Sequence, residues 1–465
     1  MADALVDGVD GDPDWRLVAA HYERAERFDE SAAAYQQASA EARRRGAISE
    51  ARAYLSIALT QLDRVMAGPE RDRREITVRL ERGFLAATAE GGSSPAGAAD
   101  FERCLTLGGT DLHDDELFAT LVALLGYCAS RADVRRLVQV LESLSAGPQE
   151  GRPWFRPVIE ACFGIAAWLR GEFDAARAHL ECATAGRDTA NHREIDAVWF
   201  IALDPIAGAL IHLALTRLVQ GDLPGAEAAV ARTVRRSDEL ALPQGPYSLA
   251  YGRMVEIWIR IEAGDLGHAA RLVADLLSQA ERDDFDAFRL FGLTQRSTVK
   301  ALTVLGADAI DPTELSARLK SMTTFVDIWR AAEMNIYLTF YDGVIGRLLT
   351  AAGRLDEARR RFDTALQLAA DTEMHFYDAE LLRLRAHTHT DSAARCADLD
   401  AARTLAGRQG ASLFELRAAL DEFDFRGEPA RAALVDVASR FPPNSPFPEF
   451  ARAKAAVRGT NPTAG

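Results

Sequence analysis

A short turn motif recurs along this sequence, and each copy has the chemistry needed to join two antiparallel helices. The copies begin at Gly171, Gly221, Gly264 and Gly353, and a variant begins at Glu26. In each copy the third position is apolar, and an acidic or small residue comes next. The glycine can adopt the left-handed conformation that ends a helix, and a small residue five positions later lets two helices approach closely. The motif therefore predicts a series of helix pairs.

The spacing of these turns is typical of a repeat protein. They recur roughly every 40 to 50 residues once Gly306 is counted as the turn between the last two glycines. No run of alternating β-branched residues bounded by turn residues is found along the sequence. This pattern predicts an all-α fold, a tetratricopeptide-like α-solenoid in which antiparallel helix pairs form a right-handed superhelix. Solenoids of this kind usually present surfaces to other molecules.

Loop-forming residues divide the predicted stack into four parts. Residues 1–13 are acidic and Gly-rich, and we expect them to be disordered. N-terminal helical repeats are expected over 14–147, and the regular repeats over 153–440, with a Gly- and Pro-rich bend between them. Residues 441–465 are expected to form a Pro-rich linker, a capping helix and a loose tail, because proline removes a backbone donor and fixes φ.

Composition excludes several classes of function. The net charge of −15 argues against direct nucleic-acid binding, which needs a basic face. No apolar run reaches the roughly 18 residues of a membrane span, and the N-terminus lacks a signal-peptide pattern. No two cysteines have C-x-x-C spacing, so we expect buried free thiols in a cytoplasmic, reducing compartment. The cysteines are Cys104, Cys128, Cys162, Cys182 and Cys396.

Six stretches of the chain carry a resemblance to a known group of proteins. They are residues 17–23, 68–75, 204–207, 246–251, 376–384 and 408–417. Together they resemble the tetratricopeptide region of bacterial cyclase, STAND-type ATPase and LuxR-type (MalT-like) regulators, from about Trp15 to Phe425. The resemblance implies an interaction or sensing solenoid, on which an effector releases an attached ATPase or DNA-binding module.

The enzymatic and DNA-binding parts of that group have no counterpart in this sequence. There is no G-x-x-x-x-G-K-[ST] phosphate loop, no cyclase-like strand with paired metal-binding aspartates, and no helix-turn-helix after Arg458. We therefore expect the solenoid alone. An ATPase, a cyclase or a transcription regulator would then be a protein partner supplied in trans.

Three polar clusters resemble a metal site, an acid–base site and a calcium-binding loop. His387 and His389 lie two positions apart, so on a helix they point in different directions and cannot share one metal ion. Residues 192–196 contain a histidine and two acids, but no nucleophile stands beside them. Residues 283–286 lack the central glycine and closing glutamate of a calcium loop. We expect no enzymatic activity, no cofactor and no metal.

A stripe of apolar and aromatic residues follows helical spacing on the first helix of three consecutive repeats. Its members are Ile165, Trp168, Ile211, Leu215, Tyr251, Met254 and Trp258. In tetratricopeptide stacks this face lines the concave groove, and an open apolar groove suits an amphipathic helix or an apolar ligand. Arg347 is expected to project into the same groove between small neighbours, Gly343 and Ala351. In a tight superhelix the stripe would instead be core.

The predicted function is that of a non-enzymatic interaction or sensing solenoid in bacterial signal transduction or transcriptional regulation. A partner segment would bind in the apolar concave groove. Two alternatives remain open. The first is a small-molecule-sensing domain whose pocket contains Trp168, Tyr251 and Trp258. The second is a structural scaffold or a self-associating protein, a homodimer that depends on residues 441–465.

Overall fold

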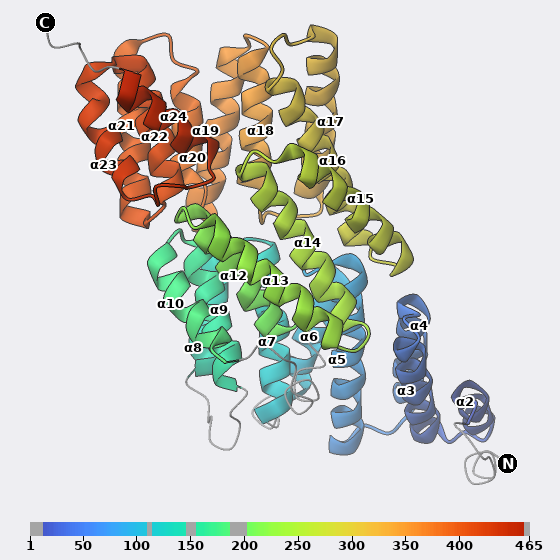
Figure 1. The fold of residues 1–465 in the computed structure, drawn as a ribbon. Helices are drawn as coiled ribbons and strands as arrows, with labels where there is room; N and C mark the ends of the chain where they lie inside the picture. Colours follow the sequence, from blue (N-terminus) through green and yellow to red (C-terminus); the bar gives the residue numbers. More distant parts are fainter. Residues whose placement is uncertain (1–12, 109–113, 146–154, 187–201, 460–465) are drawn as a thin grey trace, which may run out of the picture.

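The computed structural model describes residues 13–108, 114–145, 155–186 and 202–459. Within these ranges every regular element is a helix, and successive helices pack as neighbours along a curved stack (Figure 1). The first and last helices lie at opposite ends of the stack. The predicted fold class, an all-α tetratricopeptide-like solenoid, is confirmed.

The N-terminal helices pack in sequence order, with α3 on α4 and α5 on α6. Their bounds are α2 (Trp15–Arg24), α3 (Phe28–Arg44), α4 (Ile48–Leu62), α5 (Pro69–Glu90), α6 (Pro95–Gly108), α7 (Asp114–Ser130) and α8 (Val134–Ser145). The bend expected between the two sets of repeats falls on residues outside the described ranges, as do residues 1–12.

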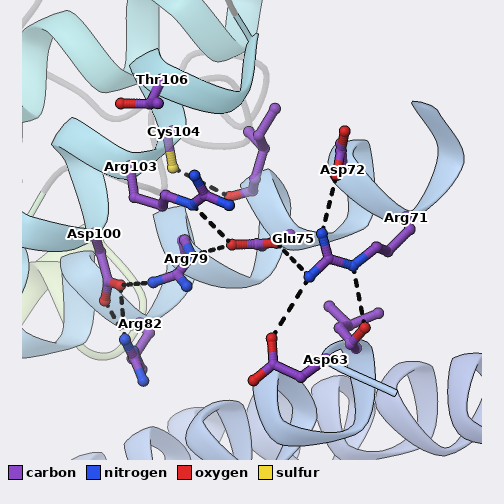
Figure 2. A network of polar contacts seen from close by, with 12 residues as sticks. Asp63, Arg71, Asp72, Glu75, Arg79, Arg82, Asp100, Arg103, Cys104 and Thr106 are labelled. Atoms are coloured by element: carbon purple, nitrogen blue, oxygen red, sulfur yellow. Dashed lines mark hydrogen bonds and ion pairs between the residues drawn. The ribbon is translucent and has the colours of Figure 1, made fainter. Parts of the chain in front are cut away.

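An ion-pair network holds α4, α5 and α6 together (Figure 2). Glu75 of α5 contacts Arg71 at 3.1 Å and Arg79 at 2.7 Å, and Arg79 also binds Asp100 of α6 at 2.9 Å. Burial acts to raise the pKa of the Glu75 carboxyl, but the surrounding arginines outweigh it, so that pKa is lowered. Because each buried carboxylate contacts more than one guanidinium, we interpret this network as structural.

The regular repeats form two layers of helices. The inner layer consists of α9 (Phe155–Leu169), α12 (Pro205–Val219), α14 (Gln244–Glu262), α16 (Asp286–Leu305), α18 (Leu338–Ala351), α20 (Asp378–Ala386) and α22 (Ser412–Arg426). The outer layer consists of α10 (Phe173–Thr184), α13 (Leu223–Glu239), α15 (Leu266–Arg282), α17 (Pro312–Ala331), α19 (Leu355–Thr372) and α21 (Ser392–Gln409). Each inner helix from α12 onward contacts the next inner helix, as well as its outer partner.

The turns lie where the motif predicts them. Gly171, Gly221, Gly264 and Gly353 each join an inner helix to its outer partner with a positive φ. Glu26 takes the same left-handed conformation without a glycine, at φ 57°. Gly306 differs, because it ends α16 with φ −91° and needs no glycine for its conformation.

The regular repeats curl until distant helices meet. The His375 N–H donates to the Leu169 carbonyl at 2.8 Å, which joins the approach to α20 to the end of α9. Arg417 of α22 binds Glu262 at the end of α14 at 2.5 Å. Helices α12 and α22 also contact each other directly. The inner layer is therefore wrapped closely around its own centre, which decides what the inner side chains can do.

The C-terminal segment folds back onto the repeats. After the 3-10 turn η1 (Glu428–Ala430) and α23 (Arg431–Ser439), the chain crosses to α24 (Pro448–Gly459), which packs on α22 and α23. The Phe441 ring lies against Gly221, where a Cβ would come within 2.6 Å of it. Phe447 and Phe450 are buried as well. The three phenylalanines of this segment are thus used within the chain.

One inner helix is short, and one expectation about local structure needs correction. Helix α20 begins at Asp378 and ends at Ala386. The expectation that all five cysteines are buried is wrong for Cys182, which is exposed, and holds fully only for Cys104 and Cys128. Cys182 lies on α10, an outer-layer helix with one face turned to solvent.

Candidate functional site

The aromatic stripe forms the packed centre of the superhelix. Trp168 is fully buried, and its ring stacks on Phe376 at 4.4 Å and meets Trp258 edge-on at 6.0 Å. Trp258 is 6% exposed and also contacts the ring of Phe340 at 5.4 Å. Phe376 lies far along the chain from Trp168, so closure of the superhelix supplies the rings that cover the stripe. An open apolar groove does not exist at these tryptophans.

The remaining predicted residues divide into three groups. Ile211, Leu215 and Met254 are buried in the same core, so the expectation that they line an open groove is not met. Ile165 and Tyr251 are only half-buried, and both line an interior cavity. Arg347 lines a second, polar cavity on the inner layer. The structure therefore separates residues that the sequence analysis placed in one groove.

The interior cavity lies between the N-terminal helices and the regular repeats. Its volume is about 170 Å³, and its walls come from α5, α6, α7, α9, α12, α14 and α16. Three aromatic residues on facing elements, Phe84, Tyr247 and Phe288, contribute to its lining. No lining residue among the described ones carries a formal charge at neutral pH.

Six residues with polar side chains line this largely apolar cavity: Ser94, Ser130, His212, Tyr247, Tyr251 and Tyr337. Ser94 donates to Glu90 and Ser130 donates to the Gly126 carbonyl. His212 of α12 uses Nδ1 to donate to the Gly208 carbonyl at 2.8 Å, which leaves Nε2 as an acceptor. Among the described residues Nε2 has no hydrogen-bond partner, and burial lowers the pKa of this imidazole to about 4. The hydroxyls of Tyr251 and Tyr337 lie 2.8 Å apart and form one hydrogen bond. One of these hydroxyls therefore keeps a hydrogen for another acceptor.

The polar cavity lies at the other end of the closed inner layer. Its volume is about 350 Å³, and α14, α16, α18, α20, α22 and α24 line it. Charged side chains of both signs reach it, and they come from helices that are far apart in sequence. They are Glu262, Arg347, Glu380, Arg383, Arg417, Asp421, Glu449 and Arg452.

Ion pairs satisfy most charges of the polar cavity. Arg417 binds Glu262 at 2.5 Å and Glu449 at 2.8 Å, and Arg383 binds Glu380 at 2.6 Å. Burial acts to raise the pKa of the Glu380 carboxyl, but the arginines around it outweigh burial and lower that pKa. The Glu380 carboxyl therefore remains ionised at neutral pH, and the ion pairs hold these side chains in place.

Arg347 differs from the other cations of the polar cavity. It makes no hydrogen bond or ion pair with any part of the chain that the structure describes, although its side chain keeps contact with solvent. Burial, with Arg383 nearby, lowers the pKa of its guanidinium and outweighs the opposing effect of Glu380 and Glu262. Arg347 is therefore a charged group with donors available, at a cavity wide enough for a ligand.

Four other arginines, on α14 and α16, have protein partners in most cases. Arg253 donates to Gln279 at 2.5 Å, Arg260 pairs with Glu227, and Arg289 pairs with Asp286 at 2.9 Å. Arg296 of α16 is exposed and lies outside the polar cavity. Arg347 alone of these five lines that cavity.

The histidines of the first polar cluster each bind a nearby carboxylate. His387 binds Asp421 at 2.7 Å, and His389 binds Asp398 at 2.8 Å, so the two histidines use different carboxylates. Residues 192–196 lie outside the described ranges. In the described part of the chain no group of three metal-binding side chains is found. The same residues contain no helix that is long and apolar enough to cross a membrane.

The sequence analysis missed most of the charged residues of the polar cavity. Glu262, Glu380 and Arg417 lie on three different repeats, and nothing in their local spacing connects them. Residues 376–384 and 408–417 were noted only as stretches that resemble a family. The sequence did contain one signal for these residues. Each is a charged residue on the inner face of a first helix, where the other side chains are small or apolar.

Comparisons with known proteins find only distant structural likeness. No protein-family model matches the sequence, and no curated protein matches it. A Rap protein complexed with competence and sporulation factor is similar, with a TM-score of 0.48 and 13% identity, over 83% of this chain and 97% of that chain. Yeast Tom70 gives a TM-score of 0.36 and 12% identity, over 96% of this chain and 94% of that chain. The P58(IPK) TPR domain gives a TM-score of 0.24 and 12% identity, over 91% of this chain and 96% of that chain. At these values the likenesses carry no conclusion about a partner.

Proposed function

We propose that this chain is a non-enzymatic, protein-interaction solenoid that acts in bacterial signal transduction or transcriptional regulation in the cytoplasm. Its partner would be an ATPase, a cyclase or a transcription regulator supplied in trans. The observation that supports an interaction site is Arg347, a cation that makes no hydrogen bond or ion pair with the described residues, at a cavity of about 350 Å³. An acidic residue in a segment of the partner would accept hydrogen bonds from its guanidinium.

The position of the polar cavity suggests how binding could be transmitted. Its walls include α14 on one side and α22 and α24 on the other, which meet only because the superhelix closes. A segment bound between them contacts both sides and favours the closed arrangement over a more open one. The partner would then recognise or respond to that change in shape.

Affinity capture with charge-reversed variants tests this proposal. The tagged chain is incubated with lysate of its host organism, in parallel with Arg347→Glu and Arg296→Glu. We expect a partner that wild type and Arg296→Glu retain and Arg347→Glu loses, since both variants change the charge equally. Circular dichroism checks that both are folded, and light scattering shows whether the captured species is a second copy. Equal capture by all three proteins would contradict a role for the polar cavity.

A second candidate function is sensing of a small molecule. The observation that favours it is the interior cavity beside Ile165 and Tyr251, since a ligand there would touch both the N-terminal helices and the regular repeats. The two tryptophans first considered for such a pocket, Trp168 and Trp258, belong to the core and do not line this cavity.

A further inference from the structure

The interior cavity has the properties of a site for one small neutral molecule. Its volume of about 170 Å³ is close to that of an engineered apolar cavity of roughly 150 Å³ that binds benzene. Packed protein interiors contain few voids larger than a water molecule. The space between these seven helices is therefore large enough for one small ring.

The lining sets the charge of that occupant. Every described residue on the wall is uncharged at neutral pH, and His212 is held neutral by its buried position. Moving a carboxylate or an ammonium group into an apolar cavity without a counter-ion costs free energy. This cost is far larger than the free energy gained by burying one apolar ring. Carboxylates, phosphates and amines are therefore excluded, and an uncharged molecule fits.

The polar atoms set its functional group. His212 offers the Nε2 lone pair and no donor, because its other nitrogen is bound to the Gly208 carbonyl at 2.8 Å. The Tyr251–Tyr337 pair, 2.8 Å between oxygens, offers one hydroxyl hydrogen. The rings of His212 and Tyr251 lie 6.2 Å apart on the same side of the cavity. A single hydroxyl group can donate to the imidazole and accept from the tyrosine.

The backbone at Tyr337 supports the same site. This residue has φ 69°, in the left-handed region that costs a residue with a side chain on the order of 1–2 kcal/mol. The conformation places the ring against Trp168 at 6.3 Å and Trp258 at 6.1 Å, with the hydroxyl on Tyr251.

We infer that the interior cavity binds an uncharged, single-ring molecule that carries one hydroxyl group, held by His212 and the Tyr251–Tyr337 pair. This inference rests on the second candidate function and is independent of the polar cavity. The ring would pack against Phe84, Tyr247 and Phe288. The molecule would join the N-terminal helices to the regular repeats and stabilise their contact.

Phenol is the probe that tests the inference, with toluene and benzoate as matched controls for the hydroxyl and for charge. Binding is measured on the full chain by titration calorimetry and by the shift in melting temperature. We expect phenol to bind and to raise the melting temperature, toluene to bind more weakly, and benzoate not to bind. Absence of phenol binding at millimolar concentration would overturn the inference, and would leave the polar-cavity proposal intact.

Three variants locate the binding. Gly126 lines the cavity, and a Cβ there meets nothing within 4 Å, so Gly126→Leu places a bulky side chain at the cavity wall and should abolish phenol binding. Tyr251→Phe removes one hydroxyl and should weaken phenol binding about tenfold. Tyr341→Phe removes a buried hydroxyl outside the cavity lining and should change nothing. Equal binding by Gly126→Leu and wild type would overturn the assignment to this cavity.

Discussion

The guanidinium of Arg417 binds the carboxylate of Glu262 at 2.5 Å although 155 positions separate them in the sequence. The same guanidinium donates to the Glu262 carbonyl at 2.9 Å and to Glu449 at 2.8 Å. Arg417 thereby connects the end of α14, the middle of α22 and the start of α24. This contact, with the His375–Leu169 backbone bond, turns an open row of helix pairs into a closed superhelix.

The first prediction concerns the energy of that connection. Arg417→Met leaves two poorly exposed carboxylates, Glu262 and Glu449, without their cation. Breaking a buried ion pair by removing one partner typically costs about 3–5 kcal/mol. We expect a loss of this size in the free energy of unfolding, measured by urea denaturation.

Arg452→Met is the control for that measurement. Arg452 also lines the polar cavity, but its pair with Asp424 is exposed on both sides. Pairs of that kind contribute about 0–1 kcal/mol. A loss for Arg417→Met no larger than for Arg452→Met would show that the Arg417 contacts do not hold the superhelix closed.

The second prediction is that replacing Arg347, unlike Arg417, makes the folded chain more stable. Its guanidinium is partly buried near Arg383 and has no ion pair or hydrogen bond among the described residues. Replacing it by methionine removes an unpaired cation and keeps most of the side-chain volume. We expect Arg347→Met to raise the melting temperature by about 1–2 °C, as is common when a binding residue is removed. A clear drop in melting temperature would mean that Arg347 is a structural residue.

Much of the fold could be predicted from local sequence, because each helix-pair turn carries its own signal. A glycine that takes positive φ, such as Gly171 or Gly353, marks its turn directly. Glu26 was recognised only because the residues around it match the motif, since it takes φ 57° without being glycine. Such signals act over a few residues, so they locate helices well.

The site could be predicted only in part, because it depends on contacts between distant repeats. Helical spacing placed Trp168 and Trp258 correctly on one inner face. Whether that face is open depends on how strongly the stack curves, and the Arg417–Glu262 contact that closes it has no local signature. Arg347 was identified as an inward-facing cation, whereas the acids around it come from helices that meet only after closure.

The third prediction separates the cysteines by reactivity. Cys182 is exposed, whereas burial raises the pKa of Cys128 to about 11 and that of Cys162 to about 12. Thiolate is the reactive form, so the buried thiols should react slowly. We expect a maleimide to modify Cys182 first in the native chain, as followed by mass spectrometry of peptides. A Cys182→Ser variant should lose this fast phase, and fast labelling of Cys128 would contradict the packing of α7.

The last prediction is a pH dependence that arises from His212. Burial lowers the pKa of its imidazole from 6.5 to about 4 in the folded chain. Between these two pH values the unfolded chain binds a proton at this side chain that the folded chain does not bind. The free energy of unfolding should therefore fall as pH decreases from 6.5 toward 4, by up to about 3 kcal/mol from this residue.

The His212→Gln variant isolates that contribution, because glutamine stays neutral over the whole range and can still donate to the Gly208 carbonyl. Urea denaturation of both proteins at pH 7 and pH 5 gives two differences in the free energy of unfolding. His375, whose pKa is raised through its hydrogen bond to Asp378, acts with the opposite sign but equally in both proteins, so it cancels. We expect the wild type to lose more stability than the variant on acidification. Equal losses would mean that His212 can accept a proton in the folded chain, which would place it in contact with water.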